Sequence, residues 1–232
     1  PHHPPRPRAY ICTPRAVDPT RPDKTRADKT KPEQTRPDPR QNTMALKLIT
    51  APAVLPITVA EAKAHLRVDV SDDDTLISAY ITAAAQLAEQ ATGRALLPQT
   101  WELTLDAFPD AFELTRTPVT SITSLIYADA TGTDITLSNT LYTLDTADEF
   151  GPAYCVPAYG TAWPATRDQV NAVRLRFVAG WADAASVPES VKAWVKLMVG
   201  AMYENREAEG ARQTHSLGYA DRLLDRYKVW HA

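Results

Sequence analysis

The sequence predicts an α+β protein that is mainly α: a helical bundle interrupted by a small antiparallel β insert, with a disordered N-terminal tail. Three observations lead to this fold class. The first 43 residues hold ten of the 19 prolines and no apolar run. In the rest of the chain, apolar residues recur at helical spacing towards both ends and at strand spacing over residues 99–180. We therefore expect a leader, residues 1–43, followed by one folded domain, residues 44–232.

The leader is repetitive and basic. A five-residue unit recurs four times within it, beginning at Thr20, Thr25, Thr30 and Thr35. It carries ten Lys or Arg against five Asp or Glu, a net charge of +5, whereas residues 44–232 carry 15 against 23, a net charge of −8. Low complexity without apolar residues predicts disorder. The leader is either a nucleic-acid-binding arm, against which its alternating charges argue, or a stretch upstream of a true start at Met44, which we favour.

Two helices are expected before the β insert. Thr58 and Glu61 have the spacing of a capping box, in which each side chain bonds a free backbone amide of the other, and they open a helix over residues 58–67. Residues 71–74 are a serine and three aspartates, which favour the positive end of a helix. A regular apolar stripe then predicts the helix over residues 72–92.

Two more helices follow the insert. Gly93 ends the helix over residues 72–92, because glycine readily adopts the left-handed conformation of a helix C-terminus. Ser186 and Glu189 form a second capping-box pattern and predict a helix over residues 187–205, whose apolar face should pack on the preceding long helix. An apolar and aromatic segment predicts a terminal helix over residues 217–229.

The β insert is identified by alternation. Trp101, Leu103 and Leu105 alternate with polar residues, which is typical of a strand buried on one face. A long loop rich in proline and glycine, residues 151–168, follows the middle strands and carries one short strand near Cys155. The remaining expected strands cover residues 112–116, 121–127, 134–137, 141–145 and 173–177, with a turn at 130–132.

Few residues are suited to catalysis or metal binding. The two cysteines, Cys12 and Cys155, exclude a disulfide framework and fit a reducing cytoplasm. No glycine-rich phosphate loop or nucleophile motif is present, and no apolar stretch has transmembrane length. His65 and Asp69 are four residues apart and could pair as a base with its orienting acid, so an uncharacterised enzyme stays an alternative. We expect no catalytic residue, no cofactor, no metal and no membrane partner.

Several blocks of residues 44–232 resemble one known family. They are LITAPAVLPITVAEAKAHLRVD from Leu48, QTWELTLDAFP from Gln99, VPAYGTAWPATR from Val156, AVRLRFVAGW from Ala172 and VPESVKAWVKLMVGAMYENRE from Val187. In this order and spacing they resemble the head-tail connector, or adaptor, family of tailed bacteriophages and prophages. The resemblance implies a helical bundle with a β insert. It also implies a virion structural protein that forms a dodecameric ring below the portal, extends the DNA channel and joins the head to a downstream neck or head-completion protein.

The same resemblance suggests partners and places. The ring would assemble in the bacterial host cytoplasm and reside in the neck of the virion. Double-stranded DNA would pass through it without sequence-specific binding. An acidic body fits this, because negative walls repel phosphate and let the duplex slide. The C-terminal segment of such families reaches the portal, a role that we transfer to Leu217, Leu223, Leu224, Tyr227 and Trp230.

Other residues are candidates for contacts with the neighbouring subunit or the next neck protein. The aromatic residues of the long loop are Tyr154, Tyr159 and Trp163. Polar candidates for the ring interface are His65, Arg67, Asp69, Glu204 and Arg206, and Arg174 and Arg176 would form salt bridges at the subunit surface. The main alternative function is a DNA-binding module, in which these two strand arginines and the basic leader would grip phosphates.

Overall fold

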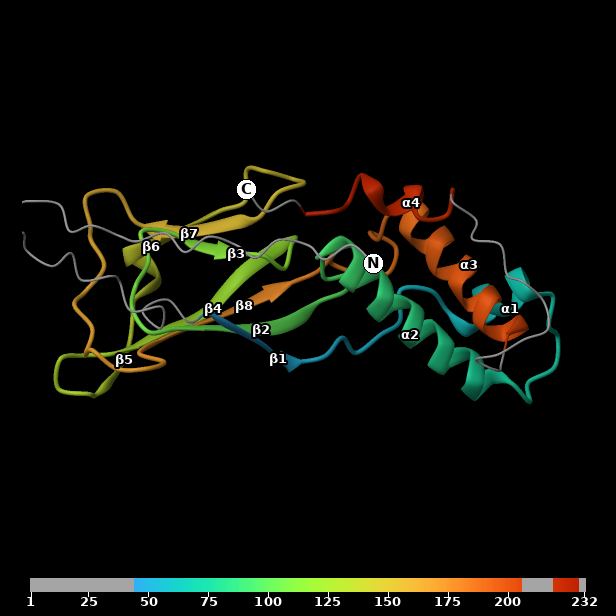
Figure 1. Cartoon of the computed structure of the whole chain (residues 1–232), viewed down its shortest axis with the longest axis horizontal. Helices are drawn as coiled ribbons and strands as arrows, with labels where there is room; N and C mark the ends of the chain where they lie inside the picture. Colours follow the sequence, from blue (N-terminus) through green and yellow to red (C-terminus); the bar gives the residue numbers. More distant parts are fainter. Residues whose placement is uncertain (1–43, 206–218, 230–232) are drawn as a thin grey trace, which may run out of the picture. The chain divides into compact units, whose positions relative to one another are not determined.

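The strands form two antiparallel sheets that share one core (Figure 1). The structure, a computed structural model, describes residues 44–205 and 219–229, which belong to one compact unit. Five strands form the larger sheet in the order β1-β2-β8-β4-β5, and three form the smaller sheet in the order β3-β7-β6. The strands are β1 Ala45–Thr50, β2 Gln99–Leu105, β3 Phe112–Leu114, β4 Val119–Ala128, β5 Asp134–Thr136, β6 Tyr142–Asp145, β7 Ala153–Pro157 and β8 Val173–Ala179.

The alternating residues of the sheets build the β core. Leu103 on β2 lies opposite Leu175 on β8, and both are buried. Phe112 on β3 lies opposite Cys155 on β7 in the smaller sheet, and these two are buried in the same cluster. The core therefore lies between the two sheets, as the period of two predicts.

The helices enclose a second core (Figure 1). Their bounds are α1 Val59–Leu66, α2 Asp74–Thr92, α3 Glu189–Glu204 and α4 Arg222–Asp225. Ile77 and Ile81 of α2 pack with Val191 and Val195 of α3, and all four side chains are fully buried. The expected packing of these two helical stripes is confirmed.

Two local signals at helix ends are confirmed. The Glu61 backbone amide donates to Thr58 Oγ1 at 3.1 Å, and the Thr58 amide donates to Glu61 Oε2 at 2.7 Å, which completes the capping box. Gly93 closes α2 with a φ of 74°, and its amide donates to the Glu89 carbonyl at 2.9 Å. Both patterns depend only on residues three or four apart, which is why the sequence reveals them.

Two other expected caps are wrong. Residue Asp73, and not Ser71, occupies the N-cap of α2, and its side chain makes no capping bond. Pro188 occupies the N-cap of α3, so Ser186 and Glu189 do not form a capping box. Ser186 instead donates through its amide and its hydroxyl to Asp183 Oδ1, each at 2.7 Å. A serine side chain can form a hydrogen bond to a preceding turn or to the backbone of a following helix, and Ser186 bonds to the turn.

The expectation of a mainly helical bundle with a small insert is wrong. Helix and strand hold 29% and 26% of the structure, and the sheets have a core of their own. Strand β1 lies before the first helix and pairs with β2, so the β region is not confined to residues 99–180. The helix expected over residues 217–229 is a single turn, α4, within the described residues. Exposed edge strands lack the apolar alternation that identifies buried ones, so the sequence did not predict β1.

Candidate functional site

The C-terminal segment, expected to meet the portal, packs on the helical core of its own chain. Leu224 is only 2% exposed, and Leu223 and Tyr227 are partly buried against the same cluster. Leu217 and Trp230 lie outside the described residues. The apolar character of the described part is therefore largely explained by folding, and its partly exposed side chains are what a partner could reach.

A buried arginine that the sequence reasoning missed holds this segment in place. Arg94 is 2% exposed, and its Nε donates to the Tyr227 carbonyl at 2.7 Å. Its Nη2 donates to the carbonyls of Glu149 and Phe150 at 3.0 and 2.7 Å. Burial lowers the pKa of Arg94, yet an arginine stays charged in proteins, so a cation links three carbonyl oxygens. The one signal in the sequence is a lone arginine before the apolar residues 95–97.

The aromatic residues of the long loop have different surroundings. Tyr159 is fully exposed, in a turn in which the Thr161 amide donates to the Ala158 carbonyl at 2.9 Å. Tyr154 on β7 is 39% exposed. Trp163 stacks on Phe108 with ring centroids 4.9 Å apart and belongs to the β core. Of the three, Tyr159 is the side chain most open to a partner.

The two strand arginines are paired within the chain. Arg174 forms an ion pair with Asp134 on β5. Arg176 donates through Nε to Glu102 Oε2 on β2 at 2.5 Å. Their charges are thus balanced by neighbouring strands of the same sheet, which weakens the idea that they grip phosphates.

The polar candidates near α1 lie on the surface. His65, Arg67 and Asp69 are exposed, and Arg67 ends α1 in a left-handed conformation with a φ of 58°. His65 lies beside Gly200 of α3 and not beside the long loop, which packs on the β core. Glu204 is exposed at the end of α3, and Arg206 lies outside the described residues.

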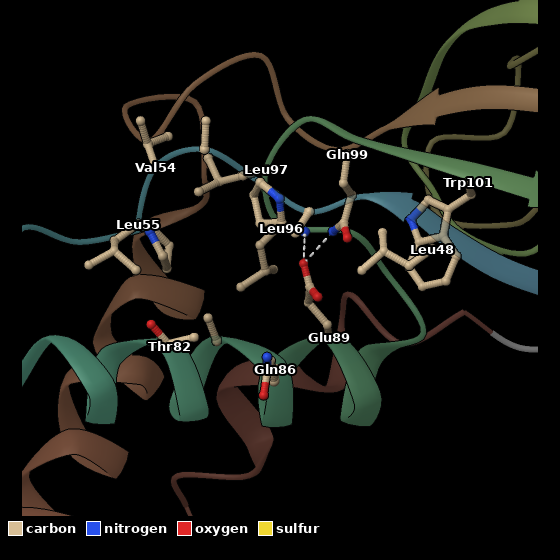
Figure 2. A pocket seen from close by; sticks show the side chains of 15 residues that line it. Leu48, Val54, Leu55, Thr82, Gln86, Glu89, Leu96, Leu97, Gln99 and Trp101 are labelled. Atoms are coloured by element: carbon tan, nitrogen blue, oxygen red, sulfur yellow. Dashed lines mark hydrogen bonds between the residues drawn. The ribbon is translucent and has the colours of Figure 1, made fainter.

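An apolar groove of about 380 Å³ lies between β1, α2 and the start of β2 (Figure 2). Its walls are formed by residues 51–56, which follow β1, and by residues 96–97, which precede β2. Two of its aliphatic residues are exposed, Leu48 to 40% and Val54 to 58%. The indole Nε1 of Trp101, another lining residue, is buried and lacks a hydrogen-bond partner among the described residues. A concave apolar surface with few polar groups is the usual form of a binding site.

The main polar group of the groove is the carboxylate of Glu89 (Figure 2). Its Oε1 accepts a bond from the Leu96 amide at 2.8 Å and another from Gln99 Nε2 at 2.6 Å. Burial raises the pKa of Glu89, because desolvation outweighs these two bonds and the nearby Arg116. Glu89 ties α2 to the start of β2 and so shapes the floor of the groove.

The raised pKa of Glu89 makes the stability depend on pH. A folded pKa above the unfolded value means that the charged form is disfavoured, so this group's contribution to stability falls as pH rises from the unfolded pKa through the folded one. In Glu89→Gln, one amide oxygen can still accept both bonds. We expect the variant to gain stability relative to the parent chain as pH rises from about 4 to about 8, measured by urea unfolding.

Glu61 provides a control of opposite sign. Its bonds to Thr58 lower its pKa, so the stability that it contributes is lost as pH falls. Glu61→Gln should therefore lose stability relative to the parent chain over the same rise in pH. Equal slopes for the two variants would contradict the assignment of the Glu89 shift to burial.

Metal and membrane sites are not found in the described part of the chain. Over residues 44–205 and 219–229, no three His, Cys, Asp or Glu side chains gather closely enough to hold an ion. No helix in these two ranges combines the length and the apolar character needed to cross a bilayer.

Comparisons with known proteins find likenesses to the necks of particles. Residues 56–140 match the family described as phage gp6-like head-tail connector protein. A search of curated proteins finds no match. A chain in the virion of the native gene transfer agent (GTA) particle has a TM-score of 0.67 and 25% identity, over 81% of this chain and 96% of that chain.

Two further solved structures are similar over almost their whole chains. A chain from the neck of the empty GTA particle, computed with C6 symmetry, has a TM-score of 0.67 and 26% identity. A chain from the neck of the native GTA particle, computed with C12 symmetry, has a TM-score of 0.64 and 26% identity. Each match covers 81% of this chain and 97% of the other. The likeness therefore includes both the helical part and the sheets.

Proposed function

We propose that the chain is a structural head-tail connector subunit of the phage gp6-like family and that twelve copies form a closed ring in the neck of a phage or a phage-like particle. The observation that carries the proposal is the match, over 81% of this chain, to chains from GTA necks. These necks were computed with C6 and C12 symmetry. The chain would act by binding and sealing, without turnover.

The ring would surround the channel through which DNA leaves the head. The net charge of −8 on residues 44–232 supports this, because an acidic wall repels phosphate and does not retain the duplex. Arg174 and Arg176 also support a channel that does not bind DNA tightly, because each is paired with a carboxylate of its own chain. The subunit would assemble in the host cytoplasm and remain in the virion.

The two ends of the ring would meet different partners. The portal contact would involve the C-terminal candidates, with Leu223, Tyr227 and the residues beyond Val229 carrying it, since Leu224 is already covered. The downstream neck or head-completion protein would meet the long loop, where exposed Tyr159 is the strongest anchor. Aromatic side chains of this kind dominate many protein interfaces.

The ring and the portal contact can be tested by light scattering. We expect the full chain, mixed with the cognate portal protein, to form a ring-sized complex whose mass fits twelve copies. A chain ending at Ser216 should lose portal binding, and Trp230→Ala should weaken it. The second variant leaves all described residues unchanged, so it separates a lost contact from a damaged helical core. Absence of any complex with the intact chain would refute the portal-bound ring.

A further inference from the structure

Within the described residues, the five-stranded sheet has two free edges, one at β1 and one at β5. Five of the six residues of β1 and all three residues of β5 are exposed. Outer backbone amides and carbonyls of an edge strand are ready to pair with another chain, and proteins usually cover or protect them. Strands β2, β8 and β4 separate the two edges, so they lie on opposite sides of the sheet.

Exposed aliphatic side chains gather at both edges. Leu48, Ile49 and Val54 lie on β1 and in the segment after it, with exposures of 40, 38 and 58%, and two of them line the apolar groove. On the opposite edge Ile135 on β5 is 37% exposed. Each edge thus offers apolar surface that the single chain leaves open to solvent.

The charges of the two edges are opposite. Lys47 is the one charged residue of β1, and Asp134 is the one charged residue of β5. Asp134 is held in place by its ion pair with Arg174. Lys47 would therefore face Asp134, whose side chain is still 61% exposed beside Arg174, if the sheet of one copy met the sheet of the next. Complementary charge favours the correct pairing over the pairing of like edges.

We infer that the β1 edge and the adjoining apolar groove of one copy receive the β5 edge of the next copy. This inference rests on the proposed ring, since a closed ring needs two different surfaces of each subunit to meet. Two opposite sheet edges with complementary charge meet that need, whereas pairing of β1 with β1 would stop at a dimer. Because β5 is short, the apolar contacts around the groove supply most of the buried area, about 800 Å² per partner in a stable interface.

Cysteine crosslinking tests the pairing of the edges. All variants are made in the full chain with Cys12→Ser; Cys155 stays, because it is buried and burial raises the pKa of its thiol to about 12. Chains carrying Ile49→Cys are mixed with chains carrying Ile135→Cys, assembled with the portal and oxidised. We expect covalent dimers from the mixture and none from either variant alone. In the double variant, higher covalent oligomers should form.

The controls separate this inference from the proposed function. Val170→Cys, at a position 70% exposed in a loop, replaces Ile135→Cys in a matched mixture and should give no crosslink. A ring that forms without crosslinks, or crosslinks from Ile49→Cys alone, would overturn the edge pairing and leave the ring in place. If no ring forms with the portal, the proposed function and this inference both fail.

A charge in the groove provides a second readout. Val54 is exposed, so Val54→Asp should leave the thermal unfolding of the single chain nearly unchanged. We expect assembly at least about tenfold weaker, since the carboxylate would be buried among aliphatic side chains of two copies. Val170→Asp is the matched control and should assemble normally. Equal assembly by the two variants would contradict a role for the groove.

Discussion

Replacing Arg94 by methionine will lower the free energy of unfolding by about 3–5 kcal/mol. The guanidinium donates three hydrogen bonds to carbonyls of Glu149, Phe150 and Tyr227. Methionine fills similar space but donates nothing, so three partly buried carbonyl oxygens lose their partner, and each such loss costs about 1–3 kcal/mol where water does not replace the bond. The guanidinium also lies over the Phe150 ring, 5.8 Å from its centroid. Urea unfolding of the variant and the parent chain measures the difference.

The same substitution should loosen the C-terminal segment before the whole chain unfolds. Arg94 joins Tyr227 to residues 149–150, which are far away in the sequence. We expect a protease to cut near residues 219–229 sooner in Arg94→Met than in the parent chain. Arg222→Met, which changes an exposed arginine on α4, is the control and should alter stability by less than about 0.5 kcal/mol. A loss below about 1 kcal/mol for Arg94→Met would show that the three bonds contribute little.

Replacing Gly180 by alanine will destabilise the fold by about 3 kcal/mol or more. Gly180 has a φ of 124°, which side-chain-bearing residues rarely adopt. A Cβ at this position would lie 2.1 Å from the Leu97 carbonyl oxygen and 2.3 Å from its carbon. These are backbone atoms, so the collision can be relieved only by moving the junction between β8 and residues 97–98. Thermal and urea unfolding measure the loss.

Gly160 separates backbone strain from collision. Its φ of 77° is also positive, but a Cβ there would meet nothing within 4 Å. Gly160→Ala should therefore cost about 1 kcal/mol from strain alone. If the two alanine variants lost equal stability, the close approach of Gly180 to the Leu97 carbonyl would not be the cause.

The resemblance to phage head-tail connectors could be seen in the sequence, but the proportions of helix and strand in the fold could not. The alternating Trp101, Leu103 and Leu105 identify β2 because one face of this strand is turned to the core. Strand β1 carries no such pattern, since it lies at a sheet edge with most residues exposed. Its existence follows from pairing with β2, whose partner residues lie 50 to 59 positions later in the chain. The helical share was overestimated for this reason and because residues 219–229, the described part of the expected terminal helix, contain a single helical turn.

Some candidate residues could be identified from the local sequence, whereas the role of others depends on how the chain folds. Tyr159 could be identified from the sequence as an aromatic residue in a proline- and glycine-rich loop, and the structure leaves it exposed. Leu224 is also apolar, and nothing in its local sequence shows that the chain covers it with its own helices. The sequence does not reveal the roles of Glu89 and Arg94, because their hydrogen-bond partners are brought near by folding.

By itself the sequence determined the features that local chemistry controls. These are the capping box at Thr58, the glycine stop at Gly93, the apolar period of α2 and α3, and the blocks that resemble phage head-tail connectors. The tertiary structure alone decided the two-sheet core, the buried Arg94, the groove and the two free sheet edges. The physical reason is distance along the chain: a cap needs neighbours three or four residues away, whereas burial, sheet order and an open edge depend on which distant segments pack together.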